Sequence, residues 1–277
     1  MNARLRPAAL APAAALMIAT VGVPFAVLAA YAFQSRGAYG GVVPPWTLEN
    51  WQRLADPLYL GILLRSFLVA ALSTALCLAM AFPLALAITR AGRWKNPLLA
   101  LVMLPFWTSL LIRTYAWMFL LRDTGLINSL LLKAGLTSEP LPLLYNWGAV
   151  VLGLVYAHLP FMVLPLYAAI ERQEPHLLEA AADLGARDWQ AFWRITLPLA
   201  APGIRAGVLL VFIPCLGTYL IPDLLGGGKT ILAGTLIQNQ FTAARDWPFG
   251  AAVSLALMAA VLVLLWLEAR RREEPLL

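Results

Sequence analysis

The sequence predicts an all-α membrane protein with six transmembrane helices. Of its 277 residues, 61% are hydrophobic and only 12% are charged, and the mean hydropathy is +0.77. A soluble domain is about 45–50% apolar and about 25% charged, so this composition excludes an ordinary soluble enzyme and a disordered chain. Six stretches are mostly apolar over about 20 residues, the length that crosses about 30 Å of hydrocarbon.

The predicted spans follow one another with no soluble domain between them. The first resembles a signal peptide, because Arg4 and Arg6 precede an alanine-rich run, but it exceeds the roughly 7–15 residues of a signal core. The fifth is the weakest, with Arg205 near its start and Pro214 near its middle. We therefore expect one transmembrane domain over residues 1–277, with spans at 7–33, 62–88, 97–121, 148–170, 203–221 and 249–267.

Proline falls inside five of these six spans, at Pro24, Pro83, Pro105, Pro160 with Pro165, and Pro214. Each proline removes a backbone donor and tends to kink its helix. Such breaks are tolerated where neighbouring helices or water satisfy the freed carbonyl groups. Two interpretations stay open, namely ordinary helix geometry and helices bent around a transport pathway.

The distribution of Lys and Arg predicts that both termini are cytoplasmic. With the N-terminus inside, twelve of the 20 Lys and Arg residues fall in inner segments and seven in outer segments. The bias is strongest in the short loop after the second span, where Arg90, Arg93 and Lys95 have no acidic neighbour. The outer segments 34–61 and 122–147 contain tryptophan, which suits the membrane interface. The net positive charge of +6 therefore indicates how the chain is oriented in the membrane.

The most informative segment is the inner loop 171–198, which predicts two short helices joined by a turn. Pro175 suits the first turn of a helix, and Gly185 stands where a left-handed cap is needed. Asp188 is the expected cap of the second helix, which we expect to end before Pro198.

Two acidic residues, Glu179 and Asp183, lie four apart on one face of the first short helix. Like charges at this spacing destabilise an isolated helix by a few tenths of a kcal/mol. The residues alone allow two interpretations. One is a solvated acidic face; the other is a knob that docks into a basic or hydrogen-bond-donating groove of a partner.

The same loop resembles the EAA loop of permease subunits of ABC-type importers. Glu179-Ala180-Ala181 is followed after three residues by Gly185, and after nine more by Ile195-x-Leu197-Pro198. In that family the loop forms the coupling helix that seats in a groove of the ATP-binding subunit. The resemblance implies this role for Glu179, Ala180, Ala181 and Gly185, with Asp183 on the same helix. We call residues 171–198 the EAA loop.

Further segments resemble the permease subunits of spermidine/putrescine importers. The resemblance is to the B-type permease subunit of these importers. These segments are residues 56–59, 104–115, 159–167, 222–229 and 245–250. The resemblance implies a type I ABC importer permease (MetI-like) fold in a bacterial inner membrane. It also implies four partners besides membrane lipid: a second permease subunit, two ATP-binding cassette subunits and an extracytoplasmic substrate-binding protein. ATP would drive alternating access through the coupling helices.

The sequence contains no complete motif for nucleotide binding, metal binding or catalysis. Residues 226–230 resemble the end of a P-loop, but Asp223 stands where the pattern needs glycine, and the segment is predicted to lie outside. His158 and His176 are far apart in sequence, so a hydrogen-bonded histidine is the better interpretation of each than a metal ligand. We expect no catalytic residue, no cofactor, no metal site and no nucleic-acid partner. The chain is predicted to be a transport subunit and not an enzyme.

A polyamine pathway needs carboxylates and aromatic faces, which replace the water around an amine by charge pairing and cation–π contact. The candidates are Asp223, Tyr219, Phe106, Trp107 and Tyr115, with Arg113 as an intramembrane charge that usually faces a cavity or a partner. A packing or gating role for the aromatic residues, and snorkelling of Arg113 to the interface, stay open.

Other solutes and another class of transporter also stay open. An opine, ferric-ion or other cation importer would share the permease architecture. A self-contained channel or secondary carrier would need no coupling loop and would usually show inverted repeats or several intramembrane charges. Neither feature is evident in the sequence.

Overall fold

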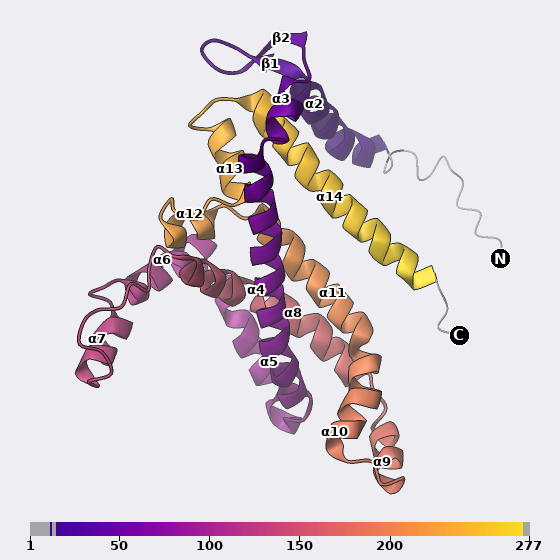
Figure 1. Cartoon of the computed structure of the whole chain (residues 1–277). Helices are drawn as coiled ribbons and strands as arrows, with labels where there is room; N and C mark the ends of the chain where they lie inside the picture. The colour runs from indigo at the N-terminus through magenta and orange to yellow at the C-terminus, as the bar shows by residue number, and fades with distance from the viewer. Residues whose placement is uncertain (1–11, 13–14, 274–277) are drawn as a thin grey trace, which may run out of the picture. The chain divides into compact units, whose positions relative to one another are not determined.

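The computed structural model describes residues 12 and 15–273, which form two compact units (Figure 1). Unit 1 comprises the described residues of Met1–Leu63 and Leu236–Leu277, and unit 2 comprises Leu64–Thr235. Two helices, α4 (Pro57–Thr89) and α13 (Ala233–Phe241), run from one unit into the other. Each unit is described below by itself.

The helices confirm the predicted fold class. Within the described residues, five helices are long and apolar enough to cross a membrane, or six if one bent pair counts as a single span. The five are Ala15–Ala32, Pro57–Thr89, Trp147–Glu171, Asp188–Gly217 and Trp247–Arg270. Residues 7–11, 13 and 14 of the first predicted span lie outside the described residues. The second and fourth spans continue through their internal prolines as single helices.

The third predicted span, 97–121, is not one helix. Helix α5 (Lys95–Met103) passes into a 3₁₀ turn, Leu104–Trp107, and α6 (Leu110–Leu121) begins after two extended residues. The two halves meet at an angle of 91°. Pro105 lies in the first turn of the 3₁₀ segment, and Thr108 has ψ of 150°, so helical hydrogen bonding stops there. Of the two interpretations left open for the prolines, the break beside Pro105 fits a bent helix and not ordinary helix geometry.

In unit 1, helix α2 (Val23–Ala32) packs along α14 (Trp247–Glu273). A two-stranded antiparallel sheet follows α2, with β1 (Gln34–Arg36) paired to β2 (Val42–Trp46). This hairpin is the one departure from the predicted all-α class among the described residues. Helix α3 (Glu49–Leu54) completes the unit, and Leu54 packs in a buried cluster around Phe249.

In unit 2, helix α8 (Trp147–Glu171) is the central helix, because 61% of its most apolar window is buried. Helix α11 (Leu197–Gly217) packs along it. A β-carbon on Gly203 would lie 2.5 Å from the Cβ of Ala169, and one on Gly207 would lie 2.6 Å from the Sδ of Met162. The small-residue pair Gly203 and Gly207 therefore lets α11 approach α8 of the same chain.

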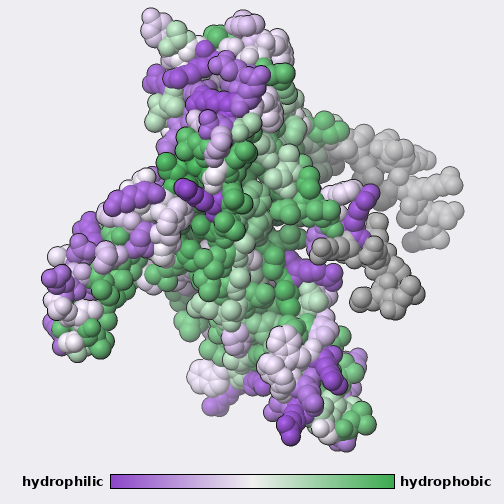
Figure 2. Space-filling view, viewed as in Figure 1, coloured by the Kyte–Doolittle hydropathy of each residue, from purple (hydrophilic) through white to green (hydrophobic). Residues whose placement is uncertain are grey.

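The remaining helices of unit 2 are short. They are α7 (Leu126–Lys133), α9 (Pro175–Asp183), α10 (Asp188–Ala191) and α12 (Leu220–Gly226). Figure 2 shows hydrophobic residues over the sides of the long helices, whereas the end of unit 2 that carries α9 and α10 is mostly hydrophilic or pale. Large apolar side chains exposed on long helices are expected where lipid or a partner subunit is the solvent.

Candidate functional site

The first helix of the EAA loop and the turn after it fold as predicted. Helix α9 begins at Pro175, and its last turn is closed by Gly185, whose φ is +78°. The Gly185 amide donates to the Ala182 carbonyl at 2.9 Å, and the Ala186 amide donates to the Ala181 carbonyl at 2.9 Å. This pair of bonds is the Schellman motif, which satisfies carbonyl groups at the end of a helix. The prediction for Pro175 and Gly185 is confirmed.

Gly185 is required by its backbone conformation and not by crowding within the chain. No atom lies within 4 Å of the position where a β-carbon would stand on Gly185. Its φ is left-handed, however, and an L-residue pays about 1–2 kcal/mol in that region. A side chain at this position would point into open space.

The surface of α9 is open to a partner. Glu179 and Asp183 are exposed, and neither carboxylate has a hydrogen bond or an ion pair within the described part of the chain. Ala180 is also exposed, whereas Ala181 is partly buried. Leu184, at the end of the helix, is 89% exposed. The loop thus presents acidic, small and apolar groups together.

The second short helix differs from the prediction in two ways. The residue that caps α10 is Arg187, and its amide donates to Oε1 of Gln190 at 3.0 Å. Asp188 is the first helical residue, where its charge favours the helix dipole without capping it. The helix also continues past Pro198, because the chain widens into a π-helical turn, Phe192–Thr196, immediately before it. Residues Asp188–Gly217 therefore form one 30-residue helix.

Two contacts tie the EAA loop to the spans, a third joins the two halves of the loop, and none of these pairings had a signal in the sequence. The ring of Phe192 packs edge-on against Phe82 of α4, with centroids 5.4 Å apart. Lys95 Nζ, at the start of α5, lies 2.6 Å from Glu171 Oε1 at the end of α8. The Gln173 amide donates to the Thr196 carbonyl at 3.0 Å.

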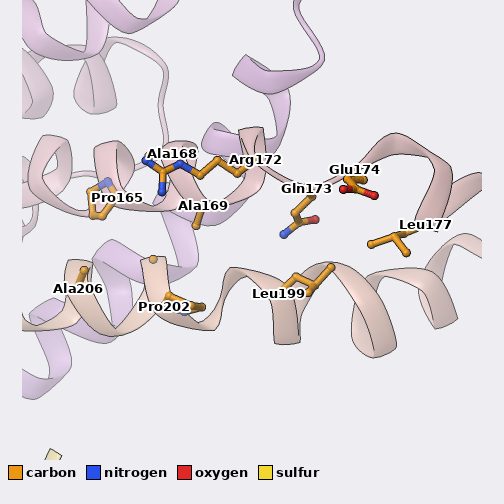
Figure 3. Close-up of a pocket in the computed structure, with 11 residues that line it drawn as sticks. Pro165, Ala168, Ala169, Arg172, Gln173, Glu174, Leu177, Leu199, Pro202 and Ala206 are labelled. Carbon is orange, nitrogen blue, oxygen red and sulfur yellow. The ribbon is translucent and has the colours of Figure 1, made fainter. Parts of the chain in front are cut away.

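A hollow of about 530 Å³ opens at the base of the loop, between the end of α8 and the start of α11 (Figure 3). Pro165 and Ala169 on α8 face Pro202 and Ala206 on α11 across it. Its polar residues come from the connection into α9, and they are Arg172, Gln173 and Glu174. The connection between α8 and α9 is therefore loosely packed against α11 at this point.

The far end of the 30-residue helix carries two of the pathway candidates. Thr218 is extended, with φ −72° and ψ 137°, and it separates α11 from α12. Asp223 lies in the first turn of α12, and its amide donates to the Tyr219 carbonyl at 3.0 Å. The Asp223 side chain is exposed, and Tyr219 is 46% exposed. Helix α12 packs on both α6 and α8.

The other candidates lie on the bent third span. Tyr115 and Arg113 are on α6, and two nitrogens of Arg113, Nε and Nη1, are buried without a hydrogen-bond partner. Phe106 packs edge-on against Phe161 of α8 at 5.3 Å, and Trp107 is 83% exposed. No hydrogen bond, ion pair or ring contact joins Phe106 or Trp107 to Asp223 among the described residues.

His158 is buried inside unit 2 and is hydrogen-bonded, as expected. Its Nδ1 lies 2.8 Å from the Leu154 carbonyl oxygen, and the Cys215 sulfur lies 3.6 Å from the same nitrogen. Among the described residues, no three metal-ligating side chains come together.

One family profile covers nearly all of the chain. It is the family described as "Binding-protein-dependent transport system inner membrane component", and it matches residues 13–270. The chain belongs to this family. It is therefore a permease component of the ABC importer class, as its EAA loop predicted, and the alternative of a self-contained channel or secondary carrier falls away.

The chain is similar to several curated permeases. It is 41% identical over 251 residues to the spermidine/putrescine transport system permease protein PotB of Haemophilus influenzae, covering 90% of this chain and 88% of that protein. It is 42% identical over 258 residues to PotB of Escherichia coli, covering 92% and 94%. The molybdenum transport system permease protein ModB of Mycobacterium bovis is 31% identical over 223 residues, covering 79% and 83%.

Two solved structures share the fold. A bacterial ABC transporter that imports the acidic polysaccharide alginate matches with a TM-score of 0.79 at 21% identity, covering 97% of this chain and 96% of that chain. The alginate transporter in complex with an alginate-bound periplasmic protein matches with a TM-score of 0.76 at 20% identity, covering 94% and 90%. The predicted fold of an ABC importer permease is confirmed.

Proposed function

We propose that this chain is the permease subunit of an ATP-driven polyamine importer, with spermidine or putrescine as the solute. The observation that carries the proposal is the 42% identity to a spermidine/putrescine permease over 92% of this chain and 94% of that protein. Identity to the molybdenum permease is lower, at 31%, and covers less of the chain. An opine, ferric-ion or other cation importer is the alternative that a solute test must exclude.

The path would be formed with a second permease subunit, and two ATP-binding subunits would dock on the EAA loops. The exposed and unpaired carboxylates of Glu179 and Asp183 support this role, because they are free to meet basic or amide groups of a partner. The small side chains of Ala180 and Ala181 allow close approach. The Schellman turn at Gly185 fixes the exit of the docking helix.

Motion at the EAA loop would reach the solute path along the 30-residue helix. Asp188, in the loop, and Gly217 are its two ends, which an α-helix of this length separates by about 45 Å. The next residues after Gly217 lead directly to Tyr219 and Asp223. A shift of the loop would thus reach the candidate amine site across one extended residue, Thr218. This geometry supports alternating access driven by closure of the ATP-binding subunits.

Asp223 is the candidate counter-charge for a polyamine amine. Between Asp188 and Asp246 it is the sole carboxylate in the sequence, and it is exposed beside Tyr219. A carboxylate and an aromatic face together replace the hydration of an ammonium group. Phe106, Trp107 and Tyr115 would supply further aromatic surface, and the unpaired nitrogens of Arg113 would act as a positive barrier beside the path.

The chain would lie in the bacterial inner membrane with both termini and the EAA loop in the cytoplasm. The excess of Lys and Arg on that side supports this orientation. A binding protein would then deliver the solute to the opposite face.

The test is reconstitution with co-purified subunits. The tagged chain is purified from its native membrane with its partners, reconstituted in liposomes with the binding protein, and assayed for ATP-dependent uptake of labelled spermidine and putrescine. Competition by an excess of an opine, ferric citrate or molybdate gives the specificity. Uptake that only the unlabelled polyamines suppress supports the proposal. Absence of ATP-dependent uptake of both labelled polyamines, or suppression of their uptake by one of the other solutes at a lower concentration than by unlabelled polyamine, contradicts the solute assignment.

A further inference from the structure

The hollow between the end of α8 and the start of α11 has the composition of a ligand site (Figure 3). Its volume of about 530 Å³ lies within the range of about 300–1,000 Å³ that small-molecule sites occupy. Pro165 and Ala168 on α8, with Pro202 and Ala206 on α11, make its walls apolar. Its charged groups gather at one end, in the connection from α8 to α9. Apolar walls with a few polar groups that orient the ligand are typical of such sites.

The hollow exists although the two helices touch beside it. A β-carbon on Gly203 would lie 2.5 Å from both the Cβ of Ala169 and the carbonyl oxygen of Pro165. On the loop side, the Gln173 side chain donates to the Thr196 carbonyl at 3.0 Å. The space therefore remains because alanine and proline line it, and these side chains are too small to fill it.

A cation and an anion border the hollow without pairing with each other. Arg172 directly follows α8, and Glu174 directly precedes α9 but makes no capping bond with its side chain. Within the described part of the chain, neither side chain has a hydrogen bond or an ion pair. Figure 3 shows Arg172 folded back along α8 beside Ala168, whereas Glu174 lies farther along the chain, away from that guanidinium.

The hollow lies where the membrane surface is expected. Helix α8 is long and apolar enough to cross a membrane, and it ends at Glu171. Arg172 therefore stands at the level of the lipid headgroups, and Ala168 and Pro165 lie one to two turns deeper along the span. Basic groups between transmembrane helices at this level bind lipid headgroups.

The free charges indicate which lipid is complementary to the site. A guanidinium binds phosphate through two parallel hydrogen bonds, and a carboxylate accepts hydrogen bonds from an ammonium group. Phosphatidylethanolamine carries a phosphate, a primary ammonium and two apolar chains. Phosphatidylglycerol lacks the cation, and the quaternary ammonium of phosphatidylcholine has no N–H to donate.

We propose that this hollow binds one molecule of phosphatidylethanolamine, with its phosphate on Arg172, its ammonium on Glu174 and one acyl chain between Pro165 and Pro202. The inference uses the place of α8 in a membrane. It depends neither on the solute nor on the side that faces the cytoplasm. The bound lipid would fill the loose packing between the α8–α9 connection and α11, and it would thereby support the EAA loop.

The test is native mass spectrometry of the complete transporter, which measures the affinity of its tightest-bound phospholipid as phosphatidylethanolamine is titrated. Arg172→Gln is expected to weaken that affinity about tenfold, through loss of the charge-assisted bonds to phosphate. Arg187→Gln is the matched control, because Arg187 is exposed at the other end of α9 and does not line the hollow. Equal affinity of the Arg172→Gln and wild-type transporters overturns the proposal.

Glu174→Gln tests the choice of headgroup. The wild type is expected to prefer phosphatidylethanolamine to phosphatidylglycerol and phosphatidylcholine, and the variant is expected to lose this preference while it still binds phospholipid. A wild-type preference for phosphatidylglycerol would overturn the assignment of a zwitterionic lipid.

A third variant tests the apolar walls. Ala168 is exposed, so the ring of Ala168→Phe would enter the hollow without disturbing buried packing, and it is expected to reduce lipid binding. Leu164→Phe is the control, because Leu164 is exposed one turn earlier on α8 and does not line the hollow. If Arg172→Gln instead lowers the amount of co-purified ATP-binding subunit and leaves lipid binding unchanged, the hollow seats that protein and the proposal is wrong.

Discussion

At the residue scale, Gly185 gives the sharpest prediction for coupling. Gly185→Arg is expected to abolish solute-stimulated ATP hydrolysis, because the new side chain would stand in the space where an ATP-binding subunit docks. Gly135→Arg is the matched control. Gly135 also ends a helix with φ of +68° and has open space at its β-carbon, so it carries the same backbone strain of about 1–2 kcal/mol away from the loop.

The comparison of the two glycine variants separates folding from coupling. Both are expected to insert in the membrane at similar levels, as measured by quantitative immunoblotting of membrane fractions. ATP hydrolysis by the reconstituted complex should be lost in Gly185→Arg and retained in Gly135→Arg. Equal activity of the two variants would refute docking at the end of α9.

Asp223 gives the prediction for solute recognition. Asp223→Asn keeps the shape of the side chain but removes its charge, so polyamine uptake is expected to need about tenfold more solute for half-maximal rate. Asp123→Asn is the control, because Asp123 is an exposed carboxylate between α6 and α7. Initial rates of labelled spermidine uptake provide the measurement. Wild-type concentration dependence in Asp223→Asn would remove this residue from the pathway.

Single residues were predictable where the reason is local. Pro175 and Gly185 follow from backbone rules that hold within one turn of a helix, and both were predicted correctly. Asp188 was misjudged as a cap, because Arg187 takes that position when Gln190 accepts from its amide. Which carboxylate meets which cation depends on tertiary approach, so the ion pair of Lys95 with Glu171 had no signature in the sequence.

At the scale of elements, the Lys95 and Glu171 pair joins the bent third span to the EAA loop. Lys at the start of a helix and Glu at the end of one both oppose the helix dipole, so the pair offsets two unfavourable positions. Each partner is partly exposed, and such pairs contribute at most about 1 kcal/mol to stability. We expect its effect to appear in coupling.

Reversing the pair tests this link. Lys95→Glu and Glu171→Lys, made singly, are expected to lower solute-stimulated ATP hydrolysis several-fold. The double variant restores opposite charges and is expected to regain most of the activity. Expression and thermal stability of the four proteins should be similar. If the double variant is no better than either single variant, the ion pair has no part in transmission.

The length of an apolar stretch predicts that a helix is present, but it does not predict where the helix bends or ends. Among the described residues, each helix long enough to span a membrane overlaps a predicted span, because about 20 apolar residues are needed to cross a membrane. The proline at position 105 allowed a bend in the third span, but the sequence did not predict its size of 91° or the π-helical turn before Pro198. A proline pattern does not reveal whether the freed carbonyl groups find other partners. The β hairpin was also missed, since it depends on contacts with residues 244 and 245.

At the scale of the whole molecule, the orientation makes a prediction about accessibility. Cys77 and Cys215 are buried, so Tyr39→Cys and Leu184→Cys each add one highly exposed thiol. In intact spheroplasts a membrane-impermeant maleimide is expected to label the Tyr39→Cys protein at once, and the Leu184→Cys protein only after permeabilisation. The reverse pattern would invert the proposed topology.

The most direct test of the account is ATP-driven uptake of labelled spermidine by proteoliposomes that contain the complete transporter. The account predicts uptake that requires ATP and the binding protein, is present with the wild-type chain, and is abolished by Gly185→Arg while Gly135→Arg retains it. Spermidine uptake that is the same with and without ATP, or that survives Gly185→Arg, would contradict a polyamine importer coupled through its EAA loop.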